Sequence, residues 1–142
     1  MKGRVLIIAG SDPSGGAGVQ ADIKTVTALG GYAAAAITAL TVQNTTGVSA
    51  VHPVDPAVIA AQIAAVLDDI GADAIKIGMI GDRASGAAIA DAIAFHATAI
   101  PVVIDPVLAA TSGDSLAGEG VAALILERLT PLAAVITPNA DE

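Results

Sequence analysis

Runs of aliphatic residues recur along the chain, and each run ends near a Gly, Pro, Asp or Asn. The first run, RVLIIAG at 4–10, shows no alternation, which is typical of a strand buried on both faces of a parallel sheet. Similar runs predict strands at 32–41, 73–80, 101–107 and 132–139, and a shorter run predicts an extra strand at 47–54. The stretches between them have helical length and predict helices at about 17–29, 56–70, 84–97 and 117–129.

Cap residues support these boundaries. Asp55 is a good N-cap for the second predicted helix, Pro56 fits its first turn, and Gly71 is a suitable stop. Strands and helices that alternate in this way indicate an α/β fold with a three-layer, doubly wound, mostly parallel sheet and right-handed crossovers. With 142 residues, of which 54% are hydrophobic, the chain is long enough for one domain with a substantial core.

Open α/β sheets bind ligands at the carboxyl ends of their strands, so the residues that follow each predicted strand are candidates for a site. In chain order they are Gly10, Ser11 and Asp12, Gln43 and Asn44, Gly78 and Met79, Asp105 and, after the last strand, Asn139, Asp141 and Glu142. Turns favour Gly, Asn and Asp for conformational reasons as well, and this explanation stays open for each residue taken singly. Together they predict a small-molecule site at one edge of the sheet.

Asp22 interrupts the apolar face of the first predicted helix. At about 100° per residue, it falls inside the arc that should face the sheet. The apolar members of that arc are Val19, Ile23, Val26 and Leu29. A carboxylate in such a place costs several kcal/mol of folding free energy unless it is paired or hydrogen-bonded. Asp22 therefore either caps a backbone group or faces a ligand pocket, and its place near the helix start favours the pocket.

The glycine-rich stretch GSDPSGGAGVQAD, at 10–22, raises the question of phosphate binding. A P-loop needs a lysine after its last glycine, and the sequence Gly15-Gly16-Ala17 has none. A dinucleotide fingerprint starting at Gly16 lies too far from the end of the first strand, and the second strand ends in Gln43 instead of an acid. Neither phosphate motif fits, although amides at a helix N-terminus still attract an anion weakly.

Composition excludes several classes of partner. Fourteen acids against six bases give a net charge of −8, which repels nucleic acid, and one Tyr, one Phe and no Trp leave no platform for stacking bases. The apolar runs are far shorter than the roughly 20 residues of a membrane span. The N-terminus does not resemble a signal peptide, and the chain has no cysteine. We expect a cytoplasmic protein that binds neither nucleic acid nor membrane.

Carboxylates are the remaining candidates for metal binding, because the two histidines, His52 and His96, are too few for a histidine cluster and are expected on the surface. Asp105 and Glu142 follow adjacent predicted strands. Oxygen ligands of this kind suit Mg²⁺, which commonly binds one or two carboxylates together with substrate phosphates. The dipeptide Asp105-Pro106 is equally consistent with a simple turn.

Five sequence blocks resemble, in order, the hydroxymethylpyrimidine and phosphomethylpyrimidine kinases of the ribokinase-like superfamily. The blocks are AGSDPSGGAGVQADIKT (9–25), ITALTVQNTTGV (37–48), KIGMIGD (76–82), VVIDPVLAATSGD (102–114) and ITPNADE (136–142). The glycine-rich block alone would be a weak signal, whereas five collinear blocks across the whole chain are specific. The resemblance implies an ATP-dependent kinase of thiamine biosynthesis that phosphorylates 4-amino-5-hydroxymethyl-2-methylpyrimidine and then its monophosphate.

Residue roles follow from the resemblance by motif. Asp22 and Gln43 would hydrogen-bond the aminopyrimidine edge, a task for which an amide supplies both a donor and an acceptor. Gly10, Met79 and the backbone near Val107 would line the ring.

The remaining polar residues of the blocks would serve the phosphate. By the same resemblance, Asp105 together with Asn139 and Glu142 would organise Mg²⁺ and the phosphate groups of ATP. Such a kinase works mainly by positioning and by neutralising charge on the transferred group.

Members of this family are nearly twice as long as this chain. The resemblance therefore implies that residues 1–142 form the N-terminal part of a single kinase domain, with catalytic residues beyond Glu142. The last strand would be an uncovered edge, which favours association, and we expect a homodimer. Two alternatives remain: an enzyme like pyridoxal kinase, which shares the superfamily, and a non-catalytic half-domain that binds an aminopyrimidine. The QNTTGV and GSDPSGGAG blocks favour the pyrimidine enzyme.

Overall fold

The computed structural model describes residues 1–109, 113 and 116–140. Within these residues, six strands form one sheet in the order β3-β2-β1-β4-β5-β6. The strands are β1 (Arg4–Ser11), β2 (Tyr32–Asn44), β3 (Gly47–Pro53), β4 (Ala74–Ile77), β5 (Val102–Ile104) and β6 (Val135–Ile136). Neighbouring strands run parallel except β2 and β3, which are antiparallel. The prediction of a mostly parallel α/β sheet is confirmed.

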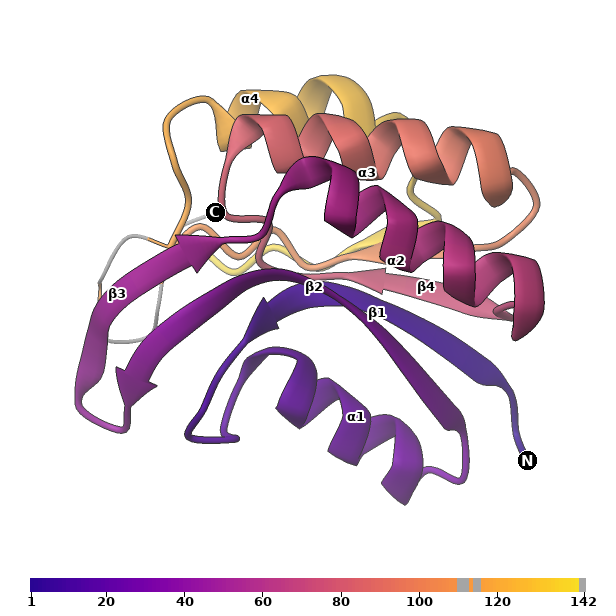
Figure 1. Cartoon of the computed structure of the whole chain (residues 1–142), viewed down its shortest axis with the longest axis horizontal. Coiled ribbons are helices and arrows are strands. Elements are labelled where there is room, and N and C mark those ends of the chain that lie inside the picture. The colour runs from indigo at the N-terminus through magenta and orange to yellow at the C-terminus, as the bar shows by residue number, and fades with distance from the viewer. Residues whose placement is uncertain (110–112, 114–115, 141–142) are drawn as a thin grey trace.

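Helices cover both faces of this sheet (Figure 1). Helix α1 (Gly18–Ala28) lies on one face, below the sheet in this view, against β1 and β2. The other face carries α2 (Pro56–Asp69), α3 (Arg83–His96) and α4 (Val121–Leu124), which continues through a π-helical turn (Ile125–Leu129) and a 3₁₀ turn (Thr130–Leu132). These three layers confirm the doubly wound prediction. No helix in the described part of the chain combines the length and the apolar content needed to cross a membrane.

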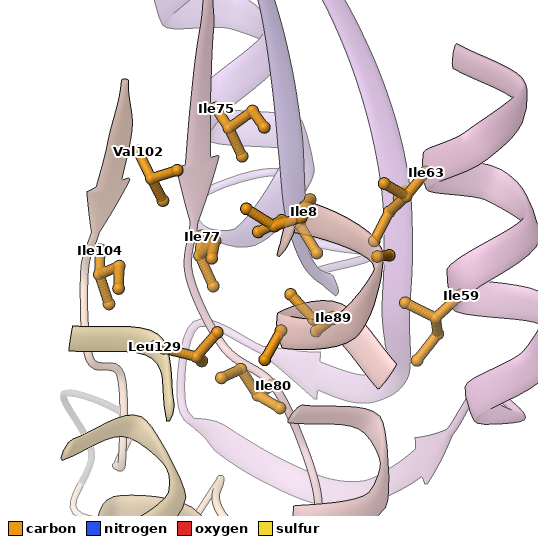
Figure 2. Close-up of a cluster of buried hydrophobic side chains, with 14 of the residues drawn as sticks. Ile8, Ile59, Ile63, Ile75, Ile77, Ile80, Ile89, Val102, Ile104 and Leu129 are labelled. Atoms are coloured by element: carbon orange, nitrogen blue, oxygen red, sulfur yellow. The ribbon is translucent and has the colours of Figure 1, made fainter. Parts of the chain in front are cut away.

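The larger core lies between the sheet and helices α2 and α3, and it is built mostly of isoleucine (Figure 2). Its fully buried side chains include Leu6, Ile8, Ile75, Ile77 and Ile104 from the strands and Ile59, Ile63 and Ile89 from the helices. A smaller cluster of Ile7, Ala9 and Val19 lies on the opposite face, under α1. Strand β1 is thus buried on both faces, as its unalternating run predicted.

The predicted helix caps are present. The carboxylate of Asp55 accepts a hydrogen bond from the backbone N–H of Ala57 at 2.8 Å, and Pro56 occupies the first turn of α2. Gly71 ends that helix with a φ of +71°, the left-handed region that favours glycine, and its N–H donates to the carbonyl of Val66. These local signals located the boundaries of α2 correctly.

Three strands are shorter than predicted, because their last residues leave the sheet to form loops at its carboxyl edge. Strand β4 ends at Ile77 instead of residue 80, and the Thr38 hydroxyl of β2 binds the carbonyl of Met79 at 2.7 Å. Strands β5 and β6 likewise end before the limits of 101–107 and 132–139. After β4, Met79 and Ile80 are buried without pairing as strands, whereas residues 137–139 after β6 are exposed. An aliphatic run thus overestimates both strand length and, at the end of the chain, burial.

The helix predicted at 117–129 begins only at Val121. The N–H of Gly118 donates to the carbonyl of Gly81 at 2.7 Å, which holds that stretch against the loop before α3. Gly120 then takes a φ of +75° and starts the helix. A tertiary hydrogen bond therefore replaces the first turn that the sequence pattern predicted.

The apolar arc predicted for α1 is only partly buried. Val19 and Val26 pack in the smaller cluster, but Ile23 is 36% exposed and Leu29 is 66% exposed. The strand residues beneath this helix include the small side chains Ala9, Ala33 and Ala35. A helix that rests on a narrow strip of alanines buries only a narrow stripe of its own surface.

Candidate functional site

A cleft of about 540 Å³ opens at the carboxyl edge of the sheet, on the face that carries α1. Loop 10–18, the start of α1, the end of β2 and the loops after β4 and β5 contribute its walls. Six of the residues proposed from the sequence line it, namely Gly10, Asp22, Gln43, Met79, Asp105 and Val107. The structure thus brings together residues that the sequence placed at the ends of separate strands and on the first helix.

Asp12 organises the glycine-rich loop. Its buried carboxylate accepts hydrogen bonds from the N–H groups of Ser14, Gly16 and Ala17 and from the Ser14 hydroxyl, at 2.8 to 3.0 Å. Burial by itself raises the pKa of this carboxyl, but the hydrogen bonds outweigh it and hold the pKa below its ordinary value. Three backbone amides that could bind a phosphate therefore donate to Asp12 instead. This agrees with the sequence of the loop, which matches neither phosphate-binding motif.

Other contacts close the same loop. The Gln20 amide accepts from the N–H of Asp12 and donates to the Ser11 hydroxyl, both at 2.8 Å. Gly18 has a φ of +57° and lies so close to the carbonyl of Gly10 that a side chain would collide with it. At Gly10, a Cβ would lie 2.8 Å from the sulfur of Met79. The glycines therefore allow the loop, the helix start and Met79 to meet at the floor of the cleft.

Gln43 enters the cleft beside an irregularity in the β2–β3 pair. Val42 pairs with Ala50 and Gln43 pairs with Val48, so Ser49 is an extra residue on β3. Bulges of this kind redirect neighbouring side chains. Within the described residues, the Gln43 side-chain amide has no hydrogen-bond partner. A half-buried amide with one donor group and one acceptor thus faces the cleft with its hydrogen-bonding capacity intact.

Asp22 pairs with a residue that the sequence analysis did not single out. The Nζ of Lys76, on β4, lies 2.8 Å from Oδ2 of Asp22 and 3.7 Å from Oδ2 of Asp105. The sequence offered two explanations for Asp22, a backbone cap or a ligand pocket, and the structure adds an ion pair within that pocket. A signal was available, since Lys76 is the one charged residue in the otherwise apolar run AIKIGMI, at 74–80.

Asp105 follows β5 and is the candidate metal ligand that lines the cleft. Its carboxylate is partly exposed and supplies the hard oxygen that Mg²⁺ prefers, so the residue fits the ion. No group of three or more acidic, His or Cys side chains that could hold a metal occurs among the residues described. The second proposed ligand, Glu142, lies outside the described residues.

Asn139, proposed for the phosphate groups, stands apart from the cleft. It is exposed beyond the end of β6, the strand next to β5, and is not part of the cleft lining. It therefore shares the carboxyl edge with the proposed residues that line the cleft without lining the cleft itself.

The fold and the cleft define a class: a doubly wound α/β protein with a small-molecule site at the carboxyl edge of its sheet. The family model for phosphomethylpyrimidine kinase matches residues 12–142. The chain belongs to the phosphomethylpyrimidine kinase family, and the resemblance seen in the sequence is confirmed.

Individual relatives agree with this assignment. The hydroxymethylpyrimidine/phosphomethylpyrimidine kinase of Rhizobium meliloti (strain 1021) is 50% identical over 137 residues, which cover 96% of this chain and 51% of that protein. The crystal structure of a phosphomethylpyrimidine kinase from Clostridium difficile 630 matches with a TM-score of 0.89 and 42% identity, covering 98% of this chain and 60% of that one. The chain spans about half the length of the curated hydroxymethylpyrimidine/phosphomethylpyrimidine kinases it matches.

A pyridoxal kinase is also similar. The structure of an ADP complex of Bacillus subtilis pyridoxal kinase matches with a TM-score of 0.83 and 39% identity, covering 98% of this chain and 51% of that one. The fold is therefore shared by kinases named for two different vitamin substrates.

Proposed function

We propose that this chain carries the pyrimidine-binding half of an ATP-dependent kinase of thiamine biosynthesis. The substrate is 4-amino-5-hydroxymethyl-2-methylpyrimidine and, in a second step, its monophosphate. The observation that carries this proposal is the Gln43 amide, which lines the cleft beside Asp22 and has no partner within the described residues. A side-chain amide that lines a cleft without a protein partner can exchange water for a ligand with complementary groups.

The ring fits the groups at this end of the cleft. An exocyclic amino group beside a ring nitrogen offers donors next to an acceptor. Gln43 Oε1 accepts from the amino group and Nε2 donates to the ring nitrogen, while Asp22 accepts the second amino hydrogen. Met79 and Val107 supply apolar contacts for the faces of the ring, and Gly10 lets its backbone approach.

Other residues would bind the metal ion and the phosphate groups. We propose Asp105 and Glu142 as the residues that hold Mg²⁺, and Asn139 as a contact for the nucleotide phosphates. When bound, the ion would supply positive charge that offsets the negative charge of the transferred phosphoryl group. Asp105 follows the strand next to the one that carries Lys76, so the metal would sit beside the ring subsite. The group that activates the hydroxymethyl oxygen is expected beyond Glu142, as the family resemblance implies.

Titration calorimetry of the chain with the hydroxymethylpyrimidine tests the proposal. Gln43→Leu should weaken binding by about 10-fold to 100-fold, because two hydrogen bonds are lost, and should leave the unfolding midpoint nearly unchanged. Gln62→Leu is the matched control. Gln62 lies on α2, across the sheet, and accepts from the N–H of Ile37, so this variant should lose stability and keep its affinity. Equal affinity for wild type and Gln43→Leu would contradict the proposal.

Pyridoxal is the second candidate substrate, favoured by the close match to a pyridoxal kinase structure. Pyridoxal lacks an amino group beside its ring nitrogen and so loses two of the three hydrogen bonds proposed for Gln43 and Asp22. We expect it to bind more weakly than the aminopyrimidine in the same titration. Tighter binding of pyridoxal than of the aminopyrimidine would indicate that pyridoxal is the substrate.

Turnover separates the kinase from a non-catalytic binding half-domain. The 142-residue chain and a version extended to the length of its relatives should both bind the pyrimidine, and only the extended version should consume ATP. Binding without turnover in both versions would favour the half-domain.

We further propose a homodimer located in the cytoplasm. Leu40 and Val42 are each 51% exposed on β2, next to β3 at the sheet edge, and such apolar surface favours association. Light scattering after size-exclusion chromatography measures the mass of the assembly, and a monomer at all concentrations would contradict the dimer.

A further inference from the structure

Lys76 stands in the middle of the sheet, on the face that α1 covers. Its strand neighbours Ile75 and Ile77 are fully buried in the core on the opposite face. Lys76 pairs in register with Ile7 of β1, and its side chain is 25% exposed. A lysine at an interior position of a short central strand loses much of its hydration, so it needs a carboxylate partner.

The structure makes room for this ammonium group. A Cβ at Gly78 would lie only 2.9 Å from Nζ of Lys76 and 3.2 Å from Cβ of Ala9. The φ of Gly78 is not positive, so the backbone itself does not demand glycine there. The absence of a side chain at Gly78 therefore leaves room for the Lys76 side chain, which extends toward the cleft.

The ammonium joins three elements of the site. It donates to Oδ2 of Asp22 on α1 at 2.8 Å and lies 3.7 Å from Oδ2 of Asp105, after β5. The Asp22 side chain makes no other hydrogen bond within the described residues. One oxygen of Asp22 is thus fixed by Lys76 and the other remains available at the wall of the cleft.

We propose that Lys76 is a positioning residue for ring recognition, an inference that rests on the proposed function. By holding Oδ2, Lys76 orients Asp22 so that Oδ1 accepts from the exocyclic amino group of the substrate. Its charge also offsets the repulsion between Asp22 and Asp105, so that a carboxylate for the ring and one for the metal share one cleft. Lys76 also lines the cleft, and in this role it acts on the ring through Asp22.

A pair of ligands separates this role from a general structural one. The first is the aminopyrimidine substrate, and the second is the same compound with hydrogen in place of the 4-amino group. Lys76→Met should weaken binding of the amino compound by about 10-fold, since one charge-assisted hydrogen bond loses its geometry, and should change binding of the second compound less than about 2-fold. Lys76→Arg keeps the charge and should recover part of the affinity.

Two further variants sharpen the test. Asp22→Ala should produce the same selective loss, and the double variant with Lys76→Met should lose no more than Asp22→Ala alone, because both act through one carboxylate. Lys24→Met is the matched control. The Lys24 ammonium donates to the carbonyl of Gly15 outside the Asp22 contact, so its removal should not distinguish the two ligands.

The outcomes are distinct for the two proposals. Equal weakening of both compounds by Lys76→Met, or losses that add in the double variant, would overturn the positioning role alone. If the wild-type chain binds neither compound, the proposed function fails and this inference fails with it. Thermal unfolding of each variant checks that the fold is retained, and Lys76→Arg carries the comparison if Lys76→Met does not fold.

Discussion

Charged side chains find different numbers of partners at the two ends of the sheet. At the amino end, Arg4 and Asp73 satisfy each other: the N–H, Nε and Nη2 of Arg4 donate to the Asp73 carboxylate, and Nη1 donates to the carbonyl of Ile70. At the carboxyl end, one ammonium group, that of Lys76, serves two carboxylates, and the amide of Gln43 has no partner among the residues described. The closed network holds strands and a helix together, whereas the open one leaves bonding capacity for a ligand.

Loop 10–18 shows that the carboxyl end also contains a closed network. Asp12 and Asp22 belong to the same βα unit, yet Asp12 takes four hydrogen bonds from its own loop and Asp22 takes one. The position in the backbone explains the difference. Asp12 begins a loop whose amides at Ser14, Gly16 and Ala17 precede α1, whereas Asp22 lies within the helix, where backbone amides bond to one another. Asp12 is therefore structural, and Asp22 is suited to a ligand.

The largest effect is expected for Asp12→Ala. The change leaves three backbone amides and the Ser14 hydroxyl without their acceptor, and we expect a loss of about 3 kcal/mol of unfolding free energy. Asp12→Asn keeps one acceptor oxygen and should lose less. Urea unfolding measures both. A stability loss no greater than that of a surface substitution would show that the loop does not depend on Asp12.

An intermediate effect is expected for Gly10→Ala, at the floor of the cleft. The added Cβ would lie 2.8 Å from the sulfur of Met79, so that flexible side chain must move into the space proposed for the ring. We expect pyrimidine binding about 10-fold weaker with a stability change below about 1 kcal/mol. Calorimetric titration and thermal unfolding measure the two quantities. Unchanged affinity would remove Gly10 from the proposed ring contacts.

The smallest effect is expected at the amino end, for Arg4→Met. Hydrogen bonds from Arg4 lower the pKa of the exposed Asp73 carboxyl from 3.8 to about 2. Because the folded-state pKa is depressed, the pair stabilises the fold above the ordinary carboxyl range, and this contribution is lost as the pH falls toward 2. Arg4→Met should lower stability slightly near neutral pH and leave ligand binding unchanged.

The pH dependence of the unfolding free energy tests whether the Arg4–Asp73 pair causes this small loss of stability. Between about pH 4 and pH 2, unfolding free energy should fall less steeply in Arg4→Met than in wild type, while the contribution of Asp12, whose pKa is also depressed, persists in both. Identical profiles would mean that the Arg4 pair does not contribute to acid stability. An effect of Arg4→Met on pyrimidine binding would contradict the separation of the two ends.

The fold was largely predictable because its signals are local. Unalternating aliphatic runs marked strands buried on both faces, and Asp55, Pro56 and Gly71 marked the ends of a helix through backbone chemistry within a few residues. Strand limits were less accurate at β4, where Ile80 is buried in the core without pairing in the sheet. Hydrophobicity reports burial, and it does not distinguish a strand from a buried loop that follows it.

For the candidate site, the sequence by itself determined which residues follow the strands, and the rule that parallel strands end at one edge gathered four residues that line the cleft, namely Gly10, Gln43, Met79 and Asp105. Asp22 was found from the helix pattern, and Val107 from the family resemblance. Only the tertiary structure decided their partners. Asp22 and Lys76 are 54 positions apart, and they meet because β4 lies beside β1 and α1 covers that face. Ion pairs and free hydrogen-bonding groups depend on distances of a few ångströms, which the strand order and the bulge beside Gln43 set.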